Sequence, residues 1–144
     1  MYADTLLALE RAHLLRLLAW GAGCVLLGTL VLAALAARRA DSPLLKHFAL
    51  QTAAWGAVAL GRALWGMRGL RLRDFDGATA LARDLWLALG LDAGFVAAGV
   101  TIAAMGWLLG RRLAPVGAGL GVAVQGAALL VLDGALAGRF SPYV

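Results

Sequence analysis

Three charged residues lie inside stretches that are otherwise apolar enough to cross a membrane: Arg62, Asp92 and Asp133. An isolated charge in hydrocarbon is costly, so ionisable groups at such positions usually face one another, a polar cavity or a partner. Their residue types suggest three kinds of chemistry. The charges can pair with each other, a carboxylate can take up a proton or a cation, or the guanidinium can hold an anionic group.

The composition predicts the elements that position these charges. Hydrophobic residues make up 62% of the 144 residues, charged residues only 15%, and the mean hydropathy is +0.84. This is far more apolar than a soluble domain of that size. Four apolar segments, each close to the roughly 20 residues that a span needs, cover residues 14–37, 48–67, 85–109 and 116–138. We therefore predict one all-α domain over residues 1–144, an integral membrane protein folded as an antiparallel up-down bundle of four transmembrane helices.

The threading of the chain predicts that the three charges lie at one depth. An even number of spans puts both termini on one side of the membrane, which we call the terminal side. At about 1.5 Å of rise per residue, Arg62 and Asp133 lie about a turn and a half from the terminal-side ends of their spans, and Asp92 about two turns inside. Arg16, at the start of the first span, can snorkel outward or reach the same layer. With Arg16 the layer holds two charges of each sign and is neutral, which avoids an unpaired charge in low dielectric.

Gln125 is the fifth candidate for this polar cluster. It lies near the middle of the fourth span, eight residues before Asp133, and so on broadly the same side of one helix. Two interpretations of the cluster stay open. A closed ion-pair layer, with Arg62 bonded to both aspartates, would hold the helices in register. A cavity from the terminal side to Gln125 would instead make the cluster a hydrated binding site.

Small residues predict how the spans pack. Glycines spaced by four allow helix backbones to approach closely, and this chain has four such pairs in its second half: Gly90 and Gly94, Gly106 and Gly110, Gly117 and Gly121, Gly134 and Gly138. We expect the third and fourth spans to pack as an antiparallel hairpin. The same motif is compatible with a homodimer. Trp65 and Trp86 are expected at the interface on the terminal side.

Motifs for enzymatic or metal chemistry are absent from the sequence. There is no paired-histidine zinc pattern, CxxC, P-loop, Rossmann fingerprint or serine with a plausible base, so we predict no metal, no cofactor and no catalytic residue. An acid–base enzyme built on Asp92 and Asp133 is the least favoured alternative. His13 and His47 fall on opposite sides of the membrane, where interfacial hydrogen bonding is the expected role of each.

Short motifs in three of the predicted spans match a known family. They are Phe48 with Trp55, Gly90-Leu91-Asp92 with Phe95, and Gln125-Gly126 with Asp133. The chain resembles, over most of its length, an uncharacterised bacterial family of small four-helix integral membrane proteins, a domain of unknown function. The family's polar residues in the second span are replaced here by Ala49, Thr52 and Gly56, so any role of those groups does not carry over. The resemblance implies Asp92, Gln125 and Asp133 as site positions, and it implies no activity.

The charge distribution predicts location and partners. The 13 Lys and Arg residues, against 8 acidic ones, cluster at the ends of apolar runs. This is typical of topogenic charges and contact with anionic lipid, and it argues against nucleic-acid binding. Their count favours the terminal side in the cytoplasm, so we expect a multi-pass protein of the bacterial inner membrane with both termini cytoplasmic. The expected partners are the lipid bilayer, including anionic lipid, and a second copy or a larger membrane complex.

These observations leave the molecular function open between two classes. The first is an accessory or scaffold membrane protein with an internal Arg, Asp and Gln layer. The second is a protein that binds or transports a small molecule, ion or lipid and uses that layer as its site. The two differ in whether water reaches Asp92 and Asp133.

Overall fold

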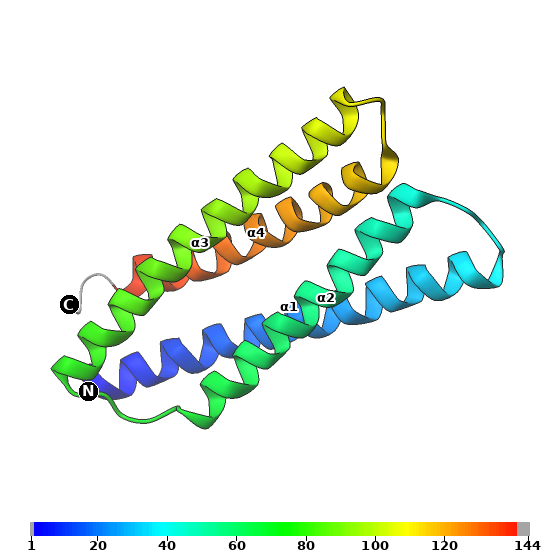
Figure 1. The fold of residues 1–144 in the computed structure, drawn as a ribbon. Coiled ribbons are helices and arrows are strands. Elements are labelled where there is room, and N and C mark those ends of the chain that lie inside the picture. The colour runs from blue at the N-terminus through cyan, green and yellow to red at the C-terminus, as the bar shows by residue number, and fades with distance from the viewer. Residues whose placement is uncertain (1, 141–144) are drawn as a thin grey trace.

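The structure is a computed structural model that describes residues 2–140. Four helices account for most of this range: α1 (Tyr2–Ala37), α2 (Pro43–Arg68), α3 (Phe75–Leu108) and α4 (Leu113–Phe140) (Figure 1). No strand occurs within the described range. The all-α, four-helix expectation is therefore confirmed. The four helices contain the four predicted spans almost entirely, and α1 and α3 extend well beyond theirs towards the terminal side.

The helix ends follow from local sequence. Ser42 caps α2 by accepting a hydrogen bond from the amide of Leu45, and Pro43 occupies the first turn, where its missing N–H is not needed. Asp74 caps α3 in the same way, with its carboxylate 2.9 Å from the amide nitrogen of Gly77. Gly110 takes a positive φ of 99° just after α3, a conformation that glycine adopts without steric cost.

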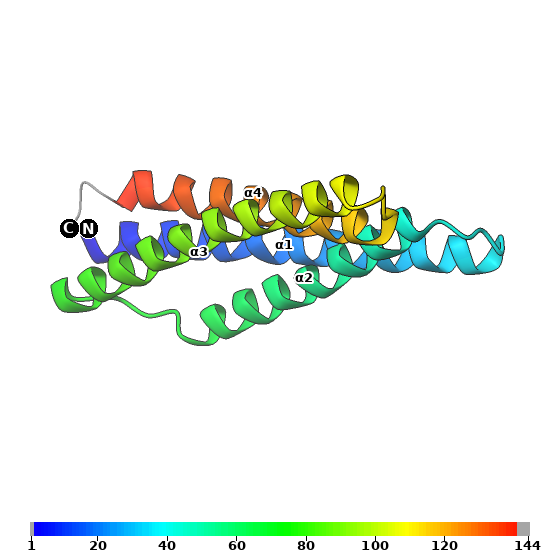
Figure 2. The same cartoon turned by 45° about the horizontal axis from the view of Figure 1, so that its top comes forward.

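The helices pack as two antiparallel hairpins laid side by side. The most extensive contacts join α3 to α4 and α1 to α2, and α2 and α4 join the two hairpins. Figures 1 and 2 show that α1 begins, and α4 ends, at the same end of the bundle, beside the connector between α2 and α3. The predicted hairpin of the third and fourth helices is confirmed.

The glycines that let these backbones approach are mostly not the predicted pairs. A Cβ on Gly99 would lie 2.4 Å from the backbone nitrogen of Ala123, and one on Gly119 would lie 2.4 Å from that of Ala103. Gly90, by contrast, has no neighbouring atom within 4 Å. Among the predicted pairs, Gly94, Gly110 and Gly138 are equally open, Gly134 makes one ordinary contact, Gly106 packs on the start of α4, and Gly117 and Gly121 pack on α2. The close α3–α4 contact therefore uses Gly99 with Ala103 on α3 and Gly119 with Ala123 on α4, small residues spaced by four that are not the predicted glycine pairs.

Three of the four helices are long and apolar enough to cross a membrane, namely α1, α3 and α4. The fold is thus that of a membrane protein by length and composition. The second helix falls short of this composition because it carries polar residues along its length, including Lys46, Gln51, Arg62 and Arg68. The sequence-based prediction of four spans is correct in the number and position of the helices. By length and composition α1, α3 and α4 support it, and the crossing of the membrane by α2 stays a prediction.

The long helices α1 and α3 form an additional layer at the terminal end. With 36 residues, α1 measures about 54 Å at 1.5 Å per residue, well above the roughly 30 Å of hydrocarbon in a bilayer. Its first turns are continuous with the rest of the helix. They pack against the start of α3 and the end of α4 through a buried cluster of Leu6, Ala78 and Phe140. This layer surrounds the polar residues described next.

Candidate functional site

The carboxylate of Asp133 is the centre of a polar cluster that joins three helices. Asp133, on α4, is completely buried. Its Oδ2 accepts a hydrogen bond from Nη2 of Arg62 on α2 at 2.5 Å. Its Oδ1 lies 3.1 Å from Nε2 of His13 on α1, an ion-pair distance without a well-aligned hydrogen bond. A buried carboxylate is therefore held between a fixed cation and an imidazole that can gain a proton.

Asp92 adds a second buried carboxylate from α3. Asp92 is 3% exposed, and its carboxyl group interacts with the carboxyl group of Asp133 and with the guanidinium of Arg62. The backbone at this point is close to α4, because a Cβ on Gly126 would lie 2.9 Å from the carbonyl oxygen of Asp92. Among the described residues, Oδ2 of Asp92 is buried and has no hydrogen-bond partner. Such an acceptor is unfavourable unless a proton, a water or another donor satisfies it.

A hollow of about 430 Å³ opens beside this cluster at the terminal end. Its charged and polar lining comes from three helices and a connector: Glu10 and His13 on α1, Arg62 on α2, Arg73 between α2 and α3, and Asp84 on α3. The side chain of Arg62 is 39% exposed although Asp133 beneath it is 0% exposed. Arg62 thus contacts the buried carboxylate on one side and the hollow on the other.

One wall of the hollow is fastened by an ion pair between Glu10 and Arg73. The guanidinium of Arg73 donates two hydrogen bonds to the carboxylate, at 3.0 and 2.7 Å. These bonds raise the pKa of Arg73 above its ordinary value, outweighing the opposite effect of burial. The pair ties the connector between α2 and α3 to the first turns of α1. Because the charge of Arg73 is balanced by Glu10, this pair shapes the rim of the hollow without adding net charge to it.

Gln125 is buried but belongs to a separate polar contact. It accepts a hydrogen bond from the indole nitrogen of Trp20 at 3.0 Å and donates one to the sulfur of Cys24 at 3.3 Å. Eight residues of helix separate it from Asp133, a rise of about 12 Å. The hollow does not extend to Gln125. Its role is to join α1 and α4 deeper in the bundle, so the two sets of polar residues predicted as one cluster are distinct.

The prediction that Arg16 contributes to the layer is not supported. Arg16 is exposed, and no ion pair of its side chain occurs within residues 2–140. The buried face of α1 carries Leu6, Glu10, His13 and Leu17, a spacing of three or four that marks one side of a helix. Arg16 is rotated by about 100° from Leu17. Arg16 therefore lies at the predicted depth but not on the buried face of α1.

His13 occupies the place that was expected for Arg16, and the sequence-based interpretation missed it. It was expected to form interfacial hydrogen bonds, yet it is 6% exposed and directed at Asp133. The signal was present in the sequence, because His13 continues the periodic run that begins with Leu6 and Glu10 and leads to Leu17. Reading the amphipathic start of the chain as part of the first helix would have placed it inside.

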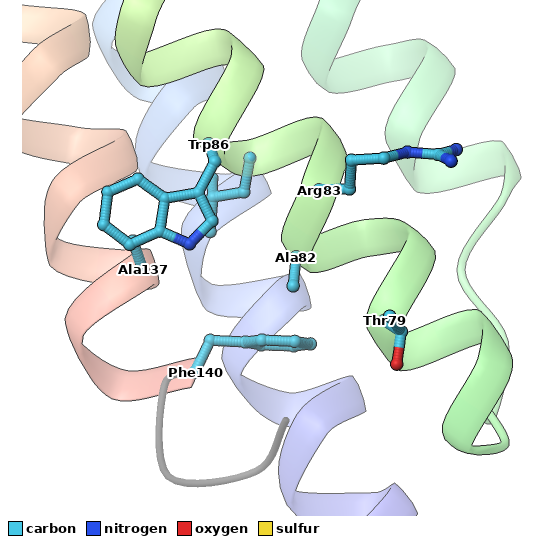
Figure 3. Close-up of a pocket in the computed structure, with 7 residues that line it drawn as sticks. Thr79, Ala82, Arg83, Trp86, Ala137 and Phe140 are labelled. Atoms are coloured by element: carbon cyan, nitrogen blue, oxygen red, sulfur yellow. The ribbon is translucent and has the colours of Figure 1, made fainter.

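A second hollow at the same end has a different character. It measures about 350 Å³ and lies between α3 and α4. In Figure 3 the rings of Trp86 and Phe140 flank it, Ala82 and Ala137 lie close by, and Arg83 extends away on the other side of α3. No buried charged group lines it. We therefore assign the candidate site to the hollow at Arg62.

The donor sets do not indicate a metal. No group of three or more His, Cys, Asp or Glu side chains in the described part of the chain is arranged to hold a metal ion. The cluster of His13, Arg62, Asp92 and Asp133 combines a guanidinium with two carboxyl groups and an imidazole. Its chemistry is therefore that of proton binding and of contact with an anion.

Comparison with known proteins identifies the family and no function. Residues 16–134 match the model of DUF6992, a family of unknown function, and the chain belongs to this family. The matched range includes Arg62, Asp92, Gln125 and Asp133. No curated protein and no solved structure matches the chain. The family provides no molecular function that can be assigned to the site.

Proposed function

We propose that this member of the DUF6992 family is a four-span membrane protein that binds a singly charged oxyanion at Arg62, in the hollow on the terminal side. The oxyanion is a phosphodiester or a carboxylate, carried either by a lipid headgroup or by a small acid in solution. In this proposal the protein lies in a bacterial inner membrane, with the hollow and both termini facing the cytoplasm.

The observation that carries the proposal is the double contact of Arg62. If the cluster served only as internal glue, the guanidinium would be enclosed and bonded to both aspartates. Instead, within residues 2–140, Arg62 bonds Asp133 alone and keeps 39% of its side chain exposed at the wall of a hollow. A guanidinium has five donors in a planar fork, and Nη2 is the one engaged with Asp133. The remaining donors suit the paired oxygens of a phosphate or carboxylate.

The surroundings of Arg62 support an anion near the membrane surface. Trp65, one turn further along α2, lines the same hollow and is 77% exposed, and Trp86 on α3 is 67% exposed. Tryptophans with this exposure are typical of the membrane–water interface. Leu14 packs against Gly66, so α1 and α2 are in register here and the hollow lies at the level of these rings. A lipid headgroup can reach this level from the side, and a dissolved acid can reach it from the water.

That α2 crosses the membrane is part of the proposal, although the composition of α2 alone does not require it. Its 26 residues give a length of about 39 Å, sufficient for a bilayer. It runs antiparallel to α1, with contacts from Gly28 beside Ala49 to Leu14 beside Gly66. Because α1 is apolar enough to cross, α2 must return through the same depth for α3 to begin at the terminal end. Its Arg62 is compensated by Asp133.

The scaffold function is the second candidate, and one observation favours it. Asp133 is contacted from α2 by Arg62 and from α1 by His13, and it belongs to α4, so three helices meet on one carboxylate. Such a cluster can fix the register of the bundle without binding anything. In that case the hollow is filled by lipid tails or water, and no anion competes for Arg62.

Binding to the purified protein in phosphatidylcholine nanodiscs discriminates the two candidates. The soluble probes are dimethyl phosphate and acetate, and phosphatidylglycerol added to the nanodiscs is the lipid probe. We expect at least one of them to bind, with the intrinsic tryptophan fluorescence changing because Trp65 lines the site. Arg62→Gln should lower the affinity at least tenfold. Arg68→Gln is the matched control, since it removes the same charge from the end of the same helix outside the hollow.

The pattern of binding identifies the source of the anion. Saturable binding of phosphatidylglycerol alone indicates a lipid site, and saturable binding of dimethyl phosphate or acetate indicates a site for a dissolved acid. Binding that is equal in the Arg62→Gln and Arg68→Gln variants, or no binding by any probe, would reject the proposal. The scaffold function would then be the better account, provided that Arg62→Gln lowers the stability of the bundle.

A further inference from the structure

We infer that the oxyanion bound at Arg62 is taken up together with one proton, which is held by His13, Asp133 and Asp92. The inference rests on the proposed function and adds its pH dependence. The proton comes from water in the hollow, so no other reactant is required. The proton uptake gives a role to His13 and Asp92, neither of which is needed for a simple contact between Arg62 and an anion.

The charges that face Asp133 do not balance without a proton. From the helices packed around it, α1 contributes His13, α2 contributes Arg62 and α3 contributes Asp92. The guanidinium is the only permanent positive charge in this group. Two buried carboxylates against one guanidinium leave one negative charge uncompensated, which low dielectric strongly disfavours. The empty cluster therefore holds one proton, either on the imidazole or on a carboxyl group.

The hydrogen bonding points to the same deficit. Oδ2 of Asp92 and Oδ1 of Asp133 are buried acceptors without a hydrogen bond in the described part of the chain. A proton on one carboxyl group turns an acceptor into a donor, and a second proton on the imidazole places a positive charge 3.1 Å from Oδ1 of Asp133. The cluster thus has separate places for two protons.

His13 connects the hollow to the buried carboxyl groups, and the charge of a bound anion favours the entry of a proton. His13 lines the hollow, whereas Asp92 and Asp133 do not. His13 contacts Asp133, and Asp133 interacts with Asp92, so a proton from the hollow reaches the deepest carboxyl group through two contacts. An anion at Arg62 brings one more negative charge and competes with Asp133 for the guanidinium. The cluster stays neutral only if a second proton enters with the anion.

Calorimetry of the intact protein in nanodiscs tests the inference, with dimethyl phosphate as the soluble probe and phosphatidylglycerol as the lipid probe. Both keep a single negative charge over the neutral pH range, so the probe itself does not titrate. Binding heats in two buffers with different ionisation enthalpies give the number of protons taken up. We expect about one proton, and an affinity that falls tenfold for each pH unit of increase.

Two variants assign the proton. His13→Gln should reduce the uptake well below one proton, because the place that remains on the carboxyl groups is already filled before the anion binds. Asp92→Asn should leave the uptake near one proton, since it removes a buried negative charge together with the proton that balances it. If either variant fails to fold, infrared spectra of the unmodified protein serve instead. A carboxylic acid carbonyl band or an imidazolium band should grow when the anion is added.

The outcomes separate the inference from the proposed function. Anion binding with no proton uptake and no growth of either band overturns the inference and leaves the proposed function standing. Uptake that is unchanged in His13→Gln overturns the assignment to this cluster. No binding by either probe overturns both.

Discussion

Nε2 of His13 lies 3.1 Å from Oδ1 of Asp133, so the first turns of the first helix are directed at a carboxylate near the end of the last. The contact brings an imidazole to a completely buried acid that already bonds Arg62. It links the bundle, the hollow and the proposed chemistry at one point. Its contribution to stability and its contribution to binding can be measured separately.

Arg62→Ala should destabilise the bundle because it leaves the carboxylate of Asp133 buried without its main partner. Removing one partner of a buried pair typically costs about 3–5 kcal/mol, and the partial exposure of Arg62 places this case at the lower end. Removing both partners in Arg62→Ala/Asp133→Ala should cost less than the sum of the single changes. Unfolding in mixed micelles measures all three. Strict additivity would show that the pair is not energetically coupled.

Gly99→Ala should destabilise the α3–α4 hairpin, since its new Cβ would meet the backbone of α4 at 2.4 Å. Gly90→Ala is the matched control on the same helix, because a Cβ there meets no atom within 4 Å. The control should be neutral or stabilising by up to about 1 kcal/mol, the helix preference of alanine over glycine. Equal effects of the two changes on thermal unfolding would contradict the close contact.

Gln125→Leu should cost about 1 kcal/mol or less, the usual value of an interhelical hydrogen bond in a membrane. The change removes the contacts to Trp20 and Cys24. It should leave anion binding unchanged, because Gln125 lies outside the hollow. Unfolding and the binding assay measured on the same preparation check both statements. A large loss of binding with little loss of stability would mean that the site reaches deeper than the hollow.

Arg73→Gln should loosen the connector between α2 and α3 without unfolding the bundle. Hydrogen exchange over residues 69–74 should accelerate in this variant and in Glu10→Gln, since either change breaks the same pair. Because the hydrogen bonds to Glu10 raise the pKa of Arg73 above its ordinary value, its guanidinium stays charged as the pH rises through the neutral and mildly alkaline range. Connector protection should therefore not decline between pH 7 and 10 in the unmodified protein. A decline in that range would contradict the role of this pair.

The sequence predicts the helices well and the site only in part. Apolar runs separated by short charged hinges were enough to predict four helices and the pairing of the last two. Depth along a helix was also predictable, so Arg62, Asp92 and Asp133 do meet. Rotation about the helix axis was not, because it depends on which face a neighbour covers. That is why Arg16 was preferred to His13 and why Gln125 was joined to a cluster that it does not contact.

The glycines illustrate the same limit in packing. Spacing by four is a local motif, and in a chain with 19 glycines many such pairs occur without a partner. The contacts that matter join Gly99 to Gly119 and Ala123, and they depend on the crossing of two helices. The pairs that make this contact, Gly99 with Ala103 and Gly119 with Ala123, are also spaced by four. Spacing alone therefore did not distinguish them from the pairs that face no neighbour.

The most direct test of the account is the accessibility of a cysteine placed in the hollow. Trp65→Cys in a Cys24→Ala background, reconstituted with known orientation, is labelled with a membrane-impermeant maleimide from each side. The account predicts labelling from the terminal side only, slowed by dimethyl phosphate or by phosphatidylglycerol, with no slowing when Arg62 is also changed to Gln. Labelling that is equal from both sides, or unaffected by any anion while Arg62 is intact, would contradict the central claim.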